Sequence, residues 1–207
     1  MKESIKIQLP ESISDITLEQ SQRYLNISES ETLSDLVKTK RIVKLFTGLK
    51  NKQVDAMTIT DYEMIINHIT TALNTDVEFT HRFTLDGIEF GFVPNLDEIT
   101  AGEYIDLTSS GVSQDTLQNI LAILFRPIVK EDRHGHYEIE AYTANTKHVE
   151  LMKQAPMNVV NGMLVFFCRL SNELEMCIVK STEEIQEEVK RRQVITSQNG
   201  DGIRQSI

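Results

Sequence analysis

The chain has 207 residues, of which 40% are hydrophobic, and it carries a formal net charge of -10. This length and composition can bury a substantial core, and they are typical of one globular domain or of one domain with an extension. The acidic charge removes the attraction to phosphate groups on which general nucleic-acid binding depends, and it disfavours adhesion to anionic membranes. We therefore expect neither a nucleic-acid partner nor a membrane.

The sequence carries no pattern typical of secretion, membrane insertion or a disulfide. An apolar run such as residues 163–168 is far shorter than the roughly 20 residues that cross a bilayer, and no basic and apolar leader stands at the N-terminus. Cys168 and Cys177 lie in a segment that reads as one helix, too far apart along its axis for a disulfide. We expect reduced thiols in the core, consistent with synthesis in a cytosol.

The first third of the chain combines an N-terminal arm with a small helical unit. In residues 1–16, the side chains of Ile5, Ile7 and Leu9 alternate with polar residues, which predicts a strand or an arm that adds to a neighbour's sheet edge. Three helices are expected next, the first capped by Thr17, the second running from Ser30 to Gly48, and the third starting near Thr60. Leu36 and Val37 are placed on the apolar face of the second helix.

From Val77 the hydrophobic period changes to two. Asp86-Gly87 is a favoured dipeptide for a two-residue hairpin turn, so we expect a hairpin that runs through Val93. Tyr104 and Leu107 predict a further strand. The acidic residues of this region are interpreted as turn and surface groups rather than as a general acid and base: Asp97, Glu98, Glu103 and Asp106.

The second half predicts a buried helix, a strand and a long helix. Ser113 caps the buried helix, Pro127 ends it, and residues 137–142 alternate as a fourth strand. Residues 157–193 predict a C-terminal helix of about 50 Å, followed by a polar tail over residues 194–207 that a partner must hold. The expected fold class is α+β, with a core domain over residues 17–156 in which a small mixed or antiparallel sheet of about four strands packs with helices.

The best metal-like set consists of His134, His136, Glu138 and Glu140, because residues two apart in a strand project from the same face. The competing interpretation places both histidines in a solvated hairpin loop near Gly135. The sequence contains none of the catalytic serine, phosphate-loop, dinucleotide-binding or zinc-protease signatures. We therefore expect no cofactor and no enzymatic activity, with a metal-dependent activity as the weakest alternative.

Seven residues are candidates for protein interfaces. Arg126 can bind a partner's carboxylate through two hydrogen bonds or satisfy local carbonyls at the end of its helix. The basic run at residues 190–192 can contact nucleic acid, although the glutamates upstream favour a solvated helix end. Methionines on the long helix, whose C-terminal half is expected to project, suit an adaptable interface. The candidates are Ile5, Ile7, Leu9, Arg126, Met176, Arg191 and Arg192.

Several short motifs occur in a fixed order along the chain. They are Asp35-Leu-Val37 through Phe46-Thr-Gly48, Val54-Asp-Ala-Met57, Asp-Gly at residues 86–87, Phe-Gly-Phe-Val-Pro-Asn-Leu-Asp at residues 90–97, Gly-Glu-Tyr-Ile-Asp-Leu at residues 102–107, Leu-Ala-Ile-Leu-Phe-Arg-Pro-Ile at residues 121–128 and Tyr-Glu-Ile-Glu-Ala-Tyr at residues 137–142. This order resembles a family of morphogenesis proteins from tailed bacteriophages of Bacteroidetes, including the crAss-like group. The resemblance covers about two thirds of the chain, residues 35–167, and departs from the pattern at Leu121, where the family often has methionine.

The resemblance implies a virion component or an assembly factor that is made in the cytoplasm of a bacterial host. A ring or connector subunit at the portal and tail is the first expectation, with a homo-oligomer and other phage neck or tail proteins as its partners. A tail-assembly chaperone that binds the tape-measure or tail-tube protein is the alternative. No catalytic residue carries over from the family.

Overall fold

The computed structural model describes residues 7–75, 78–96, 99–109, 111, 113–144 and 148–168. Over these residues it confirms an α+β fold with a four-stranded antiparallel sheet. One compact unit comprises Met1–Met163, and Leu164–Ile207 forms a second unit. The expected long helix is described only over residues 157–168, so its remainder and the polar tail lie outside the described residues.

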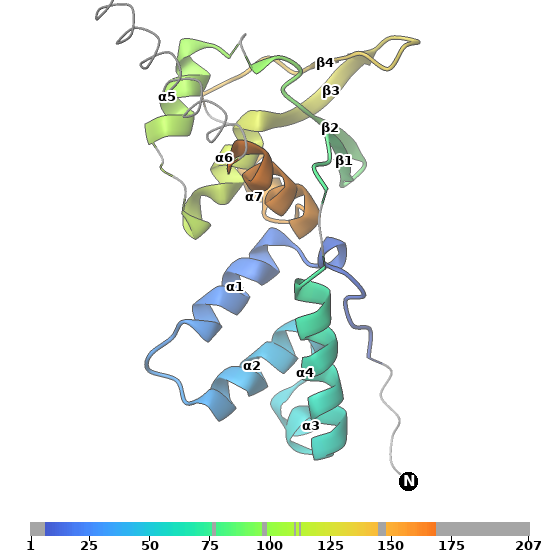
Figure 1. Cartoon of the computed structure of the whole chain (residues 1–207), viewed down its shortest axis with the longest axis vertical. Helices are drawn as coiled ribbons and strands as arrows, with labels where there is room; N and C mark the ends of the chain where they lie inside the picture. The colour runs from blue at the N-terminus through green and yellow to red at the C-terminus, as the bar shows by residue number, and fades with distance from the viewer. Residues whose placement is uncertain are drawn as a thin grey trace, which may run out of the picture. The chain divides into compact units, whose positions relative to one another are not determined.

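The N-terminal part of the first unit is helical (Figure 1), with η1 (Ile13–Asp15), α1 (Leu18–Ser28), α2 (Asp35–Thr47), α3 (Asn51–Asp55) and α4 (Ile59–Leu73). Thr17 caps α1 as predicted, because its hydroxyl accepts from the Gln20 amide while the Gln20 side chain accepts from the Thr17 amide. Gly48 ends α2 as predicted, with a φ of 68° that favours glycine.

The predicted start of α2 was wrong. The helix begins after Ser34 rather than at Ser30, and Leu36, expected on its apolar face, is 82% exposed. Burial in this helix starts later, at Val43 and Phe46. The apolar period therefore identified the helix correctly but not the face of its first turn, because only its C-terminal half packs against neighbours.

The sheet comprises β1 (Arg82–Leu85), β2 (Ile88–Phe92), β3 (Phe125–Glu131) and β4 (Tyr137–Ile139), hydrogen-bonded in that order. The predicted hairpin turn is present, since Asp86 and Gly87 have φ values of 48° and 75°, as a two-residue turn of this kind requires. Phenylalanines form the core beneath the sheet: the Phe83 ring lies 5.6 Å from that of Phe90 and 5.1 Å from that of Phe125. The last two are completely buried.

The strand predicted around Tyr104 and Leu107 is wrong, because α5 (Ala101–Ser109) occupies this segment. Thr100 and Glu103 fix the start of the helix: the Thr100 hydroxyl accepts from the Glu103 amide, and the Glu103 carboxylate accepts from the Thr100 amide. This reciprocal pair closes the first turn. Of the apolar residues that suggested a strand, Tyr104 is 64% exposed, Ile105 is 59% exposed and Leu107 is partly exposed.

A 3-10 turn, η3 (Gln114–Thr116), precedes α6 (Leu117–Leu124), which is buried on nearly all sides as predicted. The helix ends before the predicted stop, and Pro127 lies inside β3. Proline cannot donate a backbone hydrogen bond, so its position in an inner strand needs an explanation. Its carbonyl accepts from the amide of Glu140, but β4 ends at Ile139, so no regular strand residue requires the missing donor.

The chain returns through α7 (Val149–Met152) to a helix over residues 157–168, and Thr17 forms a bridge with Pro156. Gly162 lies so close to the backbone of Glu78 and Phe79 that an added Cβ would stand 2.9 Å from the Glu78 carbonyl oxygen. At the other end of the chain, residues 7–9 form no strand, whereas Ile13 is buried. The prediction of a core position for Cys168 was wrong, because this thiol is exposed.

Candidate functional site

A buried ion pair joins α5 to the sheet. The Arg126 Nη2 atom lies 2.8 Å from Glu103 Oε1, and the two side chains are only 13% and 4% exposed. The second carboxylate oxygen accepts from the Thr100 amide at 2.7 Å and from its hydroxyl at 2.6 Å. The prediction that Glu103 is a solvated surface group was therefore wrong. Arg126 binds the carboxylate of Glu103 in its own chain rather than that of a partner.

A second polar contact holds the next turn of α5. Asp106 lies three residues after Glu103, on the same side of the helix, and accepts a hydrogen bond from the Tyr142 hydroxyl. Burial of the phenol, followed by its hydrogen bond to Asp106 and the nearby negative charges, raises the pKa of Tyr142 to about 12. The Arg126 guanidinium carbon lies 5.9 Å from the centre of the Tyr142 ring. Together these four side chains, Glu103, Asp106, Arg126 and Tyr142, form what we call the α5 clamp.

The α5 clamp borders a cleft of about 440 Å³. Its lining comprises Val93, Pro94, Asn95, Thr100, Glu103, Arg126, Ile139, Glu140, Ala141 and Tyr142. Among these described lining residues the one aliphatic hydroxyl, that of Thr100, donates to Glu103, and no cysteine or histidine is present. The cleft therefore combines apolar lining residues with an ion pair whose charges neutralise each other.

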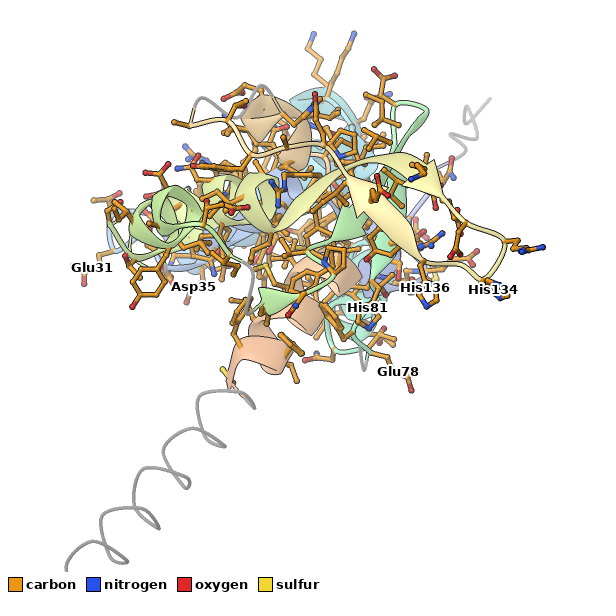
Figure 2. All side chains as sticks on the ribbon, turned by 90° about the horizontal axis from the view of Figure 1, so that it is seen from above. Glu31, Asp35, Glu78, His81, His134 and His136 are labelled. Carbon is orange, nitrogen blue, oxygen red and sulfur yellow. The ribbon has the colours of Figure 1, made fainter. Side chains whose placement is uncertain are left out.

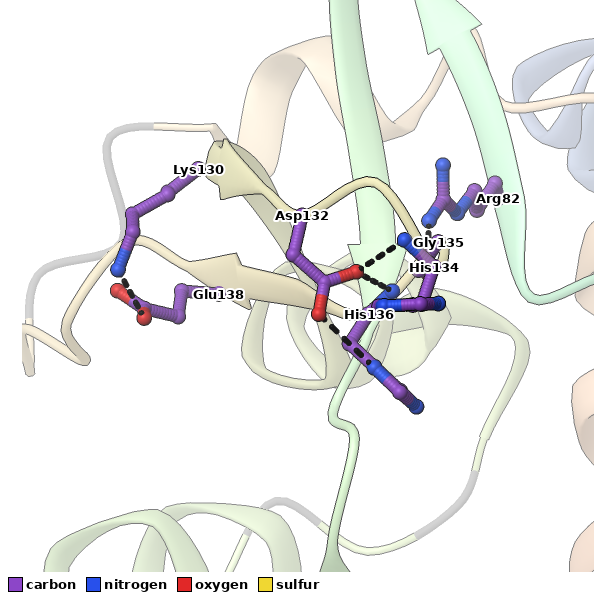
Figure 3. A network of polar contacts seen from close by, with 7 residues as sticks. All are labelled: Arg82, Lys130, Asp132, His134, Gly135, His136 and Glu138. Carbon is purple, nitrogen blue, oxygen red and sulfur yellow. Dashed lines mark hydrogen bonds and ion pairs between the residues drawn. The ribbon is translucent and has the colours of Figure 1, made fainter.

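The loop between β3 and β4 is organised by Asp132 (Figure 3). One carboxylate oxygen accepts from the backbone amides of His134, at 2.7 Å, and His136, at 3.0 Å, while the other lies 3.0 Å from the His136 Nδ1 atom. The hydrogen bond from the His136 side chain is the main reason that the pKa of Asp132 is lowered. Asp132 thus acts as the structural centre of the turn.

The structure does not bring together the four residues of the metal-like set, His134, His136, Glu138 and Glu140. Glu138 Oε1 lies 2.7 Å from Lys130 Nζ, and Glu140 Oε2 lies 3.5 Å from His148 Nε2, a contact without hydrogen-bond geometry. In the views of Figures 2 and 3, His134 and His136 stand at the tip of the hairpin with their side chains turned outward. Over the part of the chain that the structure describes, no three histidine, cysteine, aspartate or glutamate side chains are placed to hold a metal ion.

The other interface candidates are dispersed. Ile7 and Leu9 are partly exposed, and Leu9 lines a second cleft, of about 630 Å³, together with Phe46. Ile5, Met176, Arg191 and Arg192 lie outside the described residues, as do Asp97 and Glu98.

Sequence reasoning missed the α5 clamp. The Thr100-x-x-Glu103 spacing, which is a capping-box signature, was available as a signal for a helix start. No sequence signal indicates the contact between Asp106 and Tyr142, because 36 positions separate the two residues.

Comparisons with known proteins add no assignment: no family model, curated protein or solved structure matches the chain significantly. Among the described residues, no helix combines the length and the apolar character needed to cross a membrane.

Proposed function

We propose that this chain is a non-enzymatic structural protein of a tailed-bacteriophage particle, a ring or connector subunit at the portal and tail. The observation that carries the proposal is the ordered series of motifs over residues 35–167, which resembles a phage morphogenesis family. The proposed subunit is made in the cytoplasm of the bacterial host and becomes part of the virion. Its proposed partners are further copies of itself and other neck or tail proteins.

The positions of the motifs support a structural role. The Phe-Gly-Phe motif lies in β2, the motif at residues 121–128 runs from α6 into β3, and the Tyr-Glu-Ile motif forms β4. These residues build the sheet and its core. Of the ionisable side chains in the motifs, Glu103 and Arg126 neutralise each other to hold α5. These motifs therefore maintain the sheet and its core, as expected of a protein whose role is to present surfaces to its partners.

The proposal is tested on particles and on the purified protein. Quantitative mass spectrometry of purified virions is expected to find the chain at a fixed multiple of the portal protein, and light scattering with negative-stain microscopy is expected to show a closed oligomer. A chain that is absent from virions and stays monomeric at high concentration would refute the ring or connector role.

A tail-assembly chaperone is the second candidate, and exposed apolar side chains on the helical unit favour it. Leu36 on α2 is 82% exposed, and Ile59 and Met64 on α4 are 78% and 59% exposed. Such residues in a strongly acidic chain suit a soluble protein that holds an apolar segment of a tail protein. Abundance in infected cells together with absence from mature particles would select this function over the first.

A further inference from the structure

Two imidazole rings are neighbours at the tip of the hairpin formed by β3 and β4. The ring centres of His134 and His136 lie 6.4 Å apart, and both side chains are turned outward (Figures 2 and 3). The His136 side chain is 84% exposed, and His134 is exposed as well. Both rings are therefore accessible to a small ligand from solution.

Asp132 determines which ring nitrogen of His136 is available to a ligand. An ionised carboxylate can only accept, so the His136 Nδ1 atom, 3.0 Å from Asp132 Oδ2, carries the hydrogen of this contact. In the neutral imidazole the Nε2 atom then keeps its lone pair. Histidines that bind metal ions are usually held in this way, by a carboxylate on the other ring nitrogen. The contact therefore prepares His136 to bind a metal ion through Nε2.

The backbone between the two histidines is fixed by contacts with the sheet. The Gly135 carbonyl accepts from Arg82 Nη2 at 2.8 Å. Arg82 Nη1 lies 2.9 Å from Glu131 Oε1, and the guanidinium carbon lies 4.5 Å from the centre of the Tyr137 ring. Asp132 accepts from the backbone amides of both histidines. Because these contacts hold the turn, the two side chains need only rotate about their own bonds to reach a shared ligand.

The spacing of the rings fits one transition-metal ion. Two imidazoles that bind one zinc ion tetrahedrally, at N–Zn distances of about 2.0–2.1 Å, place their ring centres about 5 Å apart. The observed 6.4 Å exceeds this by about 1 Å, which small changes in the side-chain torsions of two exposed residues provide. Imidazole nitrogen suits zinc, copper and nickel ions, whereas magnesium and calcium ions prefer oxygen ligands.

Acidic side chains offset the positive charges at the tip. Arg82 is paired with both Glu131 and Glu89, at N–O distances of 2.9 and 3.6 Å. Arg133, the second guanidinium group of the tip, stands next to Asp132 in the chain. A divalent cation bound by neutral imidazoles is therefore not opposed by an excess of guanidinium groups.

We propose that His134 and His136 bind a divalent transition-metal ion of the zinc, copper and nickel class, with Asp132 as the residue that positions His136. The two glutamates of the metal-like set take no part. Because only two protein side chains bind the ion, water completes its coordination, in contrast to a closed structural zinc site with four protein ligands. The inference is independent of the proposed function as a virion protein.

Calorimetric titration of the untagged full chain with zinc chloride tests the site. The unchanged chain is expected to bind zinc, and magnesium chloride is expected to give no binding. Asp132→Asn is expected to weaken zinc binding about 10- to 100-fold, as is typical when the carboxylate partner of a metal-binding histidine is lost. His134→Ala and His136→Ala are expected to weaken it at least as much, because each removes a ligand. His68→Ala, at an exposed histidine on α4, is the matched control and is expected to change nothing.

Nitrogen-15 NMR of the histidine rings identifies the binding atom. Zinc is expected to shift the His136 Nε2 resonance while Nδ1 keeps its hydrogen. Circular dichroism is expected to give the same unfolding midpoint for His134→Ala as for the unchanged chain, so that lost binding does not reflect unfolding. The site is overturned if the unchanged chain binds no zinc or if zinc leaves the rings of His134 and His136 unshifted. Equally strong binding by the double variant of His134→Ala and His136→Ala overturns it as well.

Discussion

Replacing Glu103 by glutamine tests whether the α5 clamp depends on its buried charges. Glutamine keeps the shape of the side chain and an oxygen that can accept from Thr100, but it leaves the Arg126 guanidinium without a counter-charge at a site where that side chain is only 13% exposed. Removing one partner of a buried ion pair typically costs about 3–5 kcal/mol. For a unit of this size that loss corresponds to a decrease in Tm of roughly 6–20 °C.

Urea denaturation followed by circular dichroism measures the loss, and Glu138→Gln is the matched control. The pair between Lys130 and Glu138 has a similar N–O distance of 2.7 Å, but its side chains are 69% and 66% exposed, so its loss is expected to leave the free energy of unfolding nearly unchanged. Adding Arg126→Met to Glu103→Gln removes the unpaired charge and is expected to recover part of the stability. Equal effects of Glu103→Gln and Glu138→Gln, or simple additivity in the double variant, would refute the role of charge burial.

Three other predictions concern single positions. Gly91→Ala is expected to destabilise the sheet by about 1–3 kcal/mol, because the added Cβ would stand 2.4 Å from the Tyr137 ring. Gly102→Ala has its nearest neighbour at 3.9 Å and is expected to leave the stability of α5 unchanged or to increase it. Thermal unfolding of the two variants measures the difference. In a tyrosinate absorbance titration, Tyr142→Phe is expected to remove a phenol that ionises at about pH 12. Because this pKa lies above the ordinary value of 10.0, the contribution of the phenol to stability is complete below pH 10 and is lost as the pH rises through 12. Asp132→Asn is expected to speed amide exchange in the β3–β4 turn, since the charged acceptor of the two histidine amides is lost, and unchanged exchange would argue against its structural role.

The sequence predicted correctly those elements that are fixed by residues close to one another in the chain. The cap at Thr17, the left-handed end of α2 at Gly48 and the two-residue turn at Asp86 depend on residues within a few positions of one another, and all three are present. The largely apolar sequence of α6 likewise predicted burial on nearly all sides. These features follow from backbone geometry and hydrogen bonding that the adjacent residues determine.

The α5 segment shows why the remaining predictions failed. The apolar residues Tyr104 and Leu107 suggested a strand, although a spacing of three positions places side chains on one side of a helix. A strand also needs a neighbour to accept its backbone hydrogen bonds, and the sequence does not show where such a neighbour lies. A helix satisfies those groups within itself, and the pair of Thr100 and Glu103 closes its first turn. The capping signature at Thr100 and Glu103 is the local pattern that indicates both the helix and the inward position of Glu103, so a strand and an exposed Glu103 are the wrong predictions here.

This correction links the stability of the proposed subunit to its assembly. As a strand, the segment at residues 102–107 would have been one more part of the sheet; as a helix, it is held by side chains three positions apart that reach β3 and the chain after β4. Variants of Glu103 or Asp106 should therefore reduce folding and assembly together. Glu138→Gln, at a pair whose side chains are 69% and 66% exposed, should leave both nearly unchanged. A Glu103→Gln protein that keeps its unfolding midpoint but loses self-association would show that the pair of Glu103 and Arg126 serves the contact between copies and not the fold.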